Sequence, residues 1–226
     1  MRINVLTLFP EMFPPILGGS ILGRAVESGQ LSVNVIDIRV YSTAKHRNAD
    51  DYPFGGGAGM VMNAAPIVAA LRDITWPPRG ERRIYLSPRG RLFSQKVAFE
   101  LAAQDEFTLL CGHYEGVDER ALIIGGFEEL SIGDYVLTGG ELAAMVVIDA
   151  VTRLLPGVIS EESPQDESFG AGGGLLEYPQ YTRPREIEGL EAPDVLLGGN
   201  HARIAAWRRE QAIRVTRERR PELLDG

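Results

Sequence analysis

The stretch SIGDYVLTGGE, residues 131–141, decides the fold, because it joins a predicted strand to a long predicted helix. The apolar residues before the glycines are typical of the end of a buried β-strand: Ile132, Tyr135, Val136 and Leu137. The segment 141–155, ELAAMVVIDAVTRLL, is rich in alanine and helical in character, and Pro156 ends it. The sequence therefore predicts a strand that runs into a helix through Gly139 and Gly140.

These two glycines are the unexplained part of the stretch. Thr138 and Glu141 have the spacing of a capping box, in which the hydroxyl accepts from first-turn amides and the glutamate reaches back. A capped helix needs no glycine in its first turn, where each glycine costs about 1 kcal/mol relative to alanine. Gly139 and Gly140 therefore predict that the backbone passes close to another chain segment or to a ligand.

Composition limits the class of protein. With 226 residues, of which 44% are hydrophobic, the chain can bury one good core, or one core and a small satellite domain. The first 17 residues contain one basic residue and three prolines, so they match neither a signal peptide nor a membrane span. No later apolar run is long enough and free enough of charge to cross a bilayer, so we expect no membrane partner.

Cysteine and histidine are scarce. The single cysteine, Cys111, rules out a disulfide within the chain and is expected of a cytoplasmic protein. His46, His113 and His201 are scattered and have no spacing typical of a zinc site. We therefore assign no metal ligand from the sequence and expect no metal-centred hydrolysis.

The charge is unevenly distributed. The formal net charge of −8 argues against a nucleic-acid partner. From His201 to Arg220, however, seven arginines and two glutamates leave a local excess of +5. This stretch predicts an amphipathic helix whose buried face includes Ile204, Trp207, Ile213 and Val215. An arginine face on such a helix can also contact phosphates, so the two interpretations are compatible.

Predicted strands and helices alternate, which favours an α/β fold with a mainly parallel sheet flanked by helices. The predicted strands are 2–9, 31–40, 82–88, 107–114 and 128–137. The predicted helices are 20–28, 65–74, 93–103 and 141–155, with an arginine-rich helix that starts at Asn200. The segment 161–174 has almost no apolar residues and ends in a glycine cluster, which predicts a flexible linker.

Three glycine-bearing loops follow three of these strands. They are LSPRGR at 86–91, CGHYEGVDE at 111–119 and SIGDYVLTGG at 131–140. Because ligands of open α/β sheets bind beyond the carboxyl ends of the strands, we expect the loops to converge on one crevice. Neither a GxxxxGK[ST] phosphate loop nor a GxGxxG dinucleotide loop is present, so we expect another kind of ligand.

Several long motifs closely resemble those of the bacterial tRNA (guanine-N(1)-)-methyltransferase family. The resemblance runs from residue 3 to about residue 224. It is carried by LFPEMF (8–13), DDYPFGGGAGM (50–60), YLSPRGR (85–91), CGHYEGVDER (111–120), SIGDYVLTGGE (131–141), LLPGV (154–158), LLEYPQYTRP (175–184) and VLLGGNHARIAAWR (195–208).

This resemblance implies a fold and a division of the chain. The family belongs to the knotted (SPOUT) methyltransferase superfamily, in which a trefoil-type knot forms the methyl-donor pocket. We therefore expect a knotted donor-binding α/β domain over 1–160, the flexible linker over 161–174, and a small, mostly helical tRNA-binding domain over 175–226.

The resemblance also implies an activity and a cofactor. The family methylates the ring nitrogen of the tRNA guanosine immediately 3′ of the anticodon, with S-adenosylmethionine as donor. Its donor-binding positions match Tyr85, Leu86, Pro88, Gly90, Gly112, Tyr114, Glu115, Ile132, Gly133, Asp134, Tyr135, Val136, Leu137, Gly139 and Gly140. A magnesium requirement is implied as well, for which the sequence assigns no ligand.

The implied catalytic groups are an arginine and a carboxylate. The family's arginine matches Arg153, and its base is an aspartate directly before Ser-Phe. This chain has QDESF, so either Asp166 acts in a shifted register or Glu167 acts in place, and we expect Asp166. Both are otherwise ordinary charges of a solvated linker.

The implied partners are the tRNA anticodon stem-loop and a second copy of the chain, because members of the family are homodimers. Candidate tRNA-binding residues are His46, Arg47, Asp50, Tyr52, Arg183, His201, Arg203 and Arg208. The alternatives are a knotted methyltransferase that acts on another RNA position, and a tRNA-binding protein that has lost the chemistry.

Overall fold

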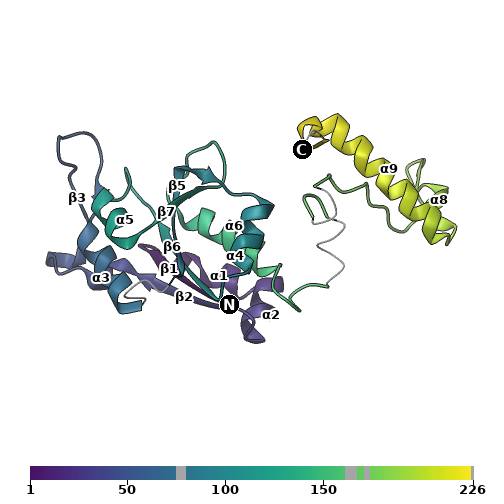
Figure 1. The fold of residues 1–226 in the computed structure, drawn as a ribbon. Helices are drawn as coiled ribbons and strands as arrows, with labels where there is room; N and C mark the ends of the chain where they lie inside the picture. The colour runs from purple at the N-terminus through teal and green to yellow at the C-terminus, as the bar shows by residue number, and fades with distance from the viewer. Residues whose placement is uncertain (75–79, 161–166, 171–173, 225–226) are drawn as a thin grey trace. The chain divides into compact units, whose positions relative to one another are not determined.

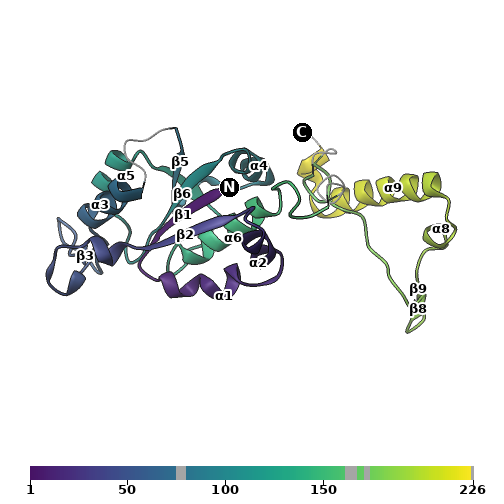
Figure 2. The same ribbon diagram turned by 90° about the horizontal axis from the view of Figure 1, so that it is seen from below.

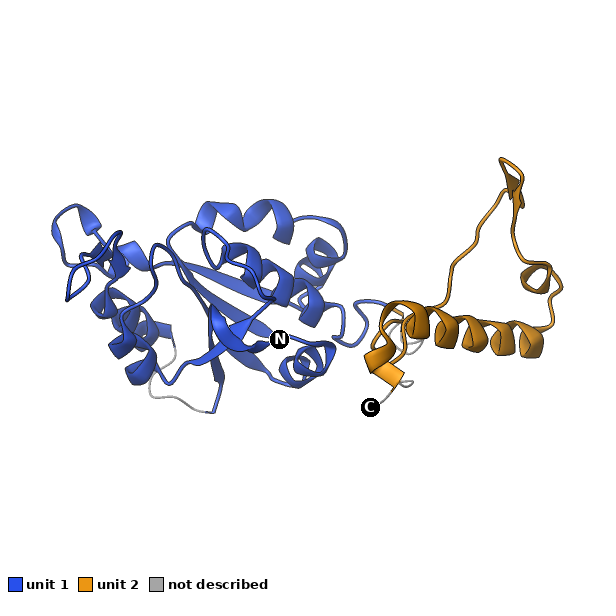
Figure 3. Cartoon of the chain, turned by 90° about the horizontal axis from the view of Figure 1, so that it is seen from above, with its two compact units in different colours: residues 1–159 blue, residues 160–226 orange. Residues whose placement is uncertain are grey.

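The computed structural model describes residues 1–74, 80–160, 167–170 and 174–224 (Figures 1 and 2). The chain divides into two compact units, residues 1–159 and 160–226 (Figure 3).

The first unit is built on a five-stranded sheet in which every pair of neighbouring strands is parallel. The strands are β1 (Arg2–Thr7), β2 (Ser32–Asp37), β5 (Arg82–Leu92), β6 (Glu106–Cys111) and β7 (Glu128–Ser131), in the order β2-β1-β6-β5-β7. This confirms the predicted parallel α/β architecture.

Alternation along the strands sends apolar side chains into two cores. Ile84 and Leu86 pack in one core, whereas Tyr85 between them packs in the other. Leu109 and Leu110 on β6 are divided in the same way. Because successive side chains of a strand point to opposite faces, apolar runs of this kind need helices on both sides of the sheet.

Helices cover both faces (Figure 1). On one side lie α1 (Pro14–Leu17), α2 (Ser20–Glu27), α4 (Gln95–Ala102) and α6 (Glu141–Thr152). On the other lie α3 (Ala64–Ile74) and α5 (Glu119–Gly125). The connections include the 3₁₀ helices η1 (Pro10–Met12), η2 (Ile38–Tyr41) and η3 (Lys45–Arg47), and a hairpin of β3 (Asp50–Asp51) and β4 (Val61–Met62).

The second unit contains β8 (Glu186–Ile187), β9 (Leu190–Glu191), α8 (Asp194–Leu197), α9 (His201–Arg219) and η4 (Pro221–Leu224). The predicted start of α9 is confirmed, because the side chain of Asn200 accepts from the Arg203 amide. Ala212 and Thr216 are its buried residues, while Ile204, Trp207, Ile213 and Val215 are only half-buried.

Three local predictions around residue 135 are wrong. The predicted strand 128–137 ends at Ser131, since the Ser131 hydroxyl bonds both the amide and the carbonyl of Gly133 and closes a turn there. Helix α6 ends at Thr152 rather than at 155. The capping box does not form, because the N-cap is Gly140 and Glu141 accepts instead from the Thr7 hydroxyl at 2.8 Å.

The predicted flexible linker and the expected absence of a membrane span can be compared with the structure only over the described residues. Much of the predicted linker, including 161–166 and 171–173, lies outside them. Among the helices that the structure describes, none is both long enough and apolar enough to span a membrane.

Candidate active site

A cavity of about 230 Å³ opens beyond the carboxyl ends of β5, β6 and β7. The three glycine-bearing loops converge on it, as predicted. Its lining residues are Tyr85, Leu86, Ser87, Pro88, Gly112, His113, Tyr114, Glu115, Gly116, Leu130, Ser131, Ile132, Gly133, Tyr135, Val136, Leu137, Thr138, Gly139, Gly140 and Ala143. Apolar walls with many backbone polar groups suit a small organic cofactor.

Gly140 lies where two chain segments that line this cavity approach each other closely. Its amide donates to the Gly112 carbonyl at 2.8 Å. A Cβ atom at Gly140 would lie 2.8 Å from the Cα of Cys111 and 2.9 Å from the amide nitrogen of Gly112. The backbone therefore passes close to another chain segment here, which was one of the two explanations left open for the glycine pair.

Gly139 leaves room for the side chains of two neighbouring residues, His113 and Glu141. It forms an isolated antiparallel bridge with His113, and a Cβ atom would lie 2.4 Å from Glu141 Oε2 and 2.6 Å from His113 Nδ1. Glu141 and His113 thus occupy the space that a side chain at residue 139 would need. The His113 Nδ1 atom is buried and has no hydrogen-bond partner among the described residues.

Two tyrosines of the cavity, Tyr85 and Tyr114, remain protonated. Burial raises the pKa of Tyr85, and the Glu129 carboxylate raises it further. Burial also raises the pKa of Tyr114, with a smaller contribution from Asp50. Both phenols are therefore hydrogen-bond donors at neutral pH.

Two predicted donor-binding residues lie outside the cavity lining, namely Gly90 and Asp134. Gly90 packs on β7, because a Cβ atom there would lie 2.3 Å from the Leu130 amide nitrogen. Asp134 is exposed on the loop after β7. Lining residues that the sequence did not single out are Ser87, His113, Gly116, Leu130, Ser131, Thr138 and Ala143, and all lie in or beside the three motifs.

The predicted catalytic residues come from both units. Arg153 is half-buried at the C-cap of α6 in the first unit, and its amide donates to the Asp149 carbonyl. Glu167 is half-buried in the second unit, where its carbonyl accepts from the Gly170 amide. Asp166 lies outside the described residues.

The chain around Glu167 is held against α9. The Glu177 amide donates to the Ser168 hydroxyl, and the Phe169 amide donates to the Leu175 carbonyl. The Leu176 amide in turn donates to the hydroxyl of Thr216 on α9. The chain at Glu167 is thereby held within the second unit, residues 160–226, which contains α9 and which we call the arginine-rich unit.

The predicted tRNA-binding residues are divided between the units. His46, Arg47, Asp50 and Tyr52 lie in the first, and Arg183, His201, Arg203 and Arg208 in the second. Most are exposed, but Arg208 is half-buried and stacks on the Tyr178 ring at 4.8 Å. Within the described ranges, no group of three or more histidine, cysteine or acidic residues is arranged to hold a metal ion.

Comparison with known proteins gives consistent matches. A sequence model described as tRNA (Guanine-1)-methyltransferase TrmD matches residues 1–226. The chain is 57% identical to the tRNA (guanine-N(1)-)-methyltransferase of Moorella thermoacetica over 99% of its length and 90% of that protein. It is 53% identical to the enzyme of the same name from Geobacillus kaustophilus (100% and 92% covered) and 51% identical to that of Clostridioides difficile (99% and 97%).

Proposed function

Since the chain belongs to the bacterial tRNA (guanine-N(1)-)-methyltransferase family, we propose that it methylates N1 of the guanosine immediately 3′ of the anticodon, in the cytoplasm, with S-adenosylmethionine as donor. The observation that supports this most directly is the convergence of three glycine-bearing loops on one cavity. We infer that the close approach of Gly140 to Gly112 is part of the knot that is characteristic of the superfamily.

The cavity residues fit such a donor. Leu86, Ile132 and Leu137 supply apolar walls, and the glycines expose backbone amides and carbonyls to an adenine ring. The protonated Tyr85 adds a side-chain polar group. When bound, the sulfonium donor supplies an already activated methyl group.

The remaining chemistry is proton removal and charge stabilisation by the chain itself. Guanine N1 carries a proton that must leave as the new bond forms, and a carboxylate in hydrogen-bond reach can accept it. Negative charge then spreads onto the guanine carbonyl oxygen, where the Arg153 guanidinium can stabilise it. Arg153 ends α6, whose first turn lines the donor cavity, so one rigid helix links the two positions.

We propose Asp166 as the base, with Glu167 as the competing residue. The bonds that join 168–169 to 175–177, and 176 to α9, hold the chain next to Glu167 in the second unit, and Asp166 directly precedes Glu167 in the sequence. A base in the second unit would reach the active site together with the RNA that this unit is proposed to bind.

The loop that carries Asp50 and Tyr52 lies beside the donor cavity. A Cβ atom at Gly59 would lie 2.5 Å from Glu115 Oε1, and the Glu115 amide donates to the Met60 carbonyl at 3.0 Å. Tyr52 and Phe54 on this loop are 79% and 97% exposed. Exposed aromatic rings of this kind stack on the unpaired bases of RNA loops.

We propose that the active form is a homodimer. Helix α6 exposes Leu142 and Val146, one turn apart, although most of the helix is buried. Val136 on the cavity loop is also 84% exposed. A second copy that covers these apolar side chains would remove them from water.

The activity is tested by incubating the full chain with an unmodified tRNA transcript and tritiated S-adenosylmethionine. Nucleoside analysis should find 1-methylguanosine, and reverse transcription should stop at the residue 3′ of the anticodon, because N1-methylation blocks Watson–Crick pairing. Incorporation at another position would favour a different RNA methyltransferase. Donor and tRNA binding without incorporation would mean that the chemistry has been lost.

A further inference from the structure

One wall of the cavity lies at an irregularity in the pairing of β5 with β7. Leu86 and Arg91 of β5 both pair with Leu130 of β7, so residues 87–90 have no partner in the ladder between them. Leu86, Ser87 and Pro88 face the cavity. The shape of this wall therefore depends on what closes the excursion of residues 87–90.

Two arginine–glutamate groups flank the excursion. On one side, the Arg89 guanidinium binds Glu129 through two hydrogen bonds of 3.1 and 2.9 Å, and lies 3.6 Å from Glu119 on α5. On the other side, the Arg91 Nη2 atom lies 3.1 Å from Glu100 on α4 and 3.9 Å from Glu128 on β7. The excursion is therefore tied to β7 and to a helix on each face of the sheet.

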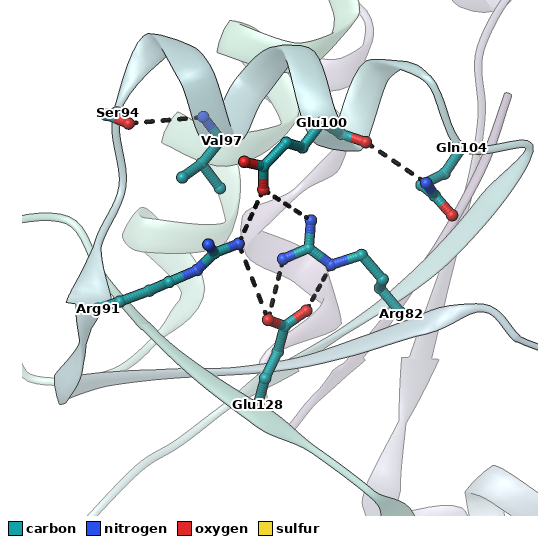
Figure 4. Close-up of polar contacts among 7 residues, drawn as sticks. All are labelled: Arg82, Arg91, Ser94, Val97, Glu100, Gln104 and Glu128. Atoms are coloured by element: carbon teal, nitrogen blue, oxygen red, sulfur yellow. Dashed lines mark hydrogen bonds and ion pairs between the residues drawn. The ribbon is translucent and has the colours of Figure 1, made fainter.

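Arg82 completes the second group (Figure 4). Its guanidinium binds both oxygens of Glu128, at 2.5 and 2.9 Å, and lies 3.5 Å from Glu100. Figure 4 shows both arginines directed at the same two carboxylates, above the strand that carries Glu128. Glu100 is placed by α4, which begins at the Ser94 cap directly after β5.

Arg82 and Arg91 are nine residues apart in β5, yet both contact Glu128. Nine residues of a continuous strand would span about 30 Å, too far for both side chains to reach one carboxylate. With residues 87–90 excluded, Arg91 lies at the level of Leu86, about 13 Å along the strand from Arg82. The shared contact with Glu128 is therefore possible only while residues 87–90 remain looped out.

We propose that Arg89 and Arg91, with Glu129, Glu128 and Glu100, act as positioning residues that hold the 87–90 excursion in its donor-binding shape. The proposal rests on the proposed function, because it concerns the methyl-donor cavity. None of these side chains lines the cavity, so they act through Leu86, Ser87 and Pro88. The Arg89 amide, which donates to the Ser87 hydroxyl at 3.2 Å, links the ion pair to the wall.

The test is calorimetric titration of S-adenosylmethionine into the full chain without RNA. Arg89→Met and Arg91→Met should each raise the donor Kd about three- to fivefold, the upper range for well-ordered exposed pairs. The donor KM should rise by the same factor, and kcat should stay within about twofold. Raising the salt concentration from about 0.05 M to about 0.5 M should weaken donor binding by the wild type more than by Arg89→Met.

Arg2→Met is the matched control. Arg2 pairs with Glu106 on the same sheet, and the side-chain exposures of 63% and 28% nearly equal the 63% and 27% of Arg89 and Glu129. The control should change the donor Kd by less than about twofold, because neither residue of that pair touches the excursion.

Three outcomes would overturn the proposal. Equal donor Kd values for Arg89→Met and Arg2→Met would show that the pairs are ordinary surface contacts. An equal salt dependence of donor binding in the wild type and in Arg89→Met would mean that the ion pair is not the cause. Failure of the wild type to bind S-adenosylmethionine would refute the proposed function itself, a result that these variants cannot produce.

Discussion

Gly140→Ala should destabilise the first unit without any backbone strain. The φ angle of Gly140 is −79°, which alanine adopts freely, so the cost is steric. The new methyl group would lie 2.8 Å from the Cys111 Cα and 2.9 Å from the Gly112 nitrogen, and both are backbone atoms in the interior. They cannot turn away as a side chain can. Overpacking of this kind costs up to about 3 kcal/mol, and separating the segments also lengthens the Gly140–Gly112 hydrogen bond.

A loss of about 3 kcal/mol should lower the melting temperature by about 6–12 °C for a unit of this size. Scanning calorimetry of the full chain measures it, and titration of S-adenosylmethionine below the transition should show weaker binding. Gly19→Ala is the control, since its φ of −108° is also ordinary and its nearest contact would be an unstrained 3.5 Å. If the two variants melt within about 2 °C of each other, the close approach at Gly140 does not constrain the fold.

Three more predictions concern the chemistry, the RNA and the buried thiol. Asp166→Asn should lower the single-turnover methylation rate by about 10²–10⁴ with unchanged donor affinity, and Glu167→Gln should lower it far less; the reverse ranking would assign the base to Glu167. Arg203 is exposed, so Arg203→Gln should make the slope of log K for tRNA binding against log salt concentration shallower by about one unit and leave the melting temperature unchanged. Arg208→Gln should make the slope shallower in the same way. It should also lower the melting temperature, because the contact of Arg208 with Tyr178 is lost. Burial, and secondarily Glu141, raise the pKa of Cys111 well above its usual range. The folded chain should then hold this proton more tightly than the unfolded chain, so unfolding free energy falls as pH rises above about 8.5, more steeply in the wild type than in Cys111→Ala.

The parallel sheet and the convergence of the three glycine-bearing loops on one cavity were predictable from the sequence, because both follow from local patterns. Apolar runs such as residues 107–111 mark the strands, and parallel strands present their carboxyl ends at one edge. The cavity then follows without knowledge of any ligand. Glycines in three separate loops indicated it more securely than any single motif.

The wrong prediction of a capping box involves a partner that is distant in sequence. Thr138 and Glu141 fit a capping box locally, but the glutamate bonds Thr7, 134 residues away, in a buried site. A carboxylate removed from water needs a hydrogen-bond donor there, and this requirement outweighs a cap that backbone and solvent can replace. The wrong end of the predicted strand 128–137 has a local cause instead. Val136 and Leu137 are apolar and extend the strand pattern, but Ser131 closes a turn with Gly133 before them.

The two irregular features of the fold solve one structural problem. A regular parallel sheet ends in a flat edge, and a small cofactor needs a concave site with walls of fixed shape. The excursion of residues 87–90 raises one wall from β5, and the loop 132–140, secured by the Gly140–Gly112 hydrogen bond, raises the opposite one. Both walls are closed by bonds within the first unit, so the donor cavity needs no RNA to form. The carboxylate assigned to proton removal belongs to the arginine-rich unit instead. We therefore propose that donor binding depends on the first unit, while the base belongs to the second unit together with the arginine-rich helix α9.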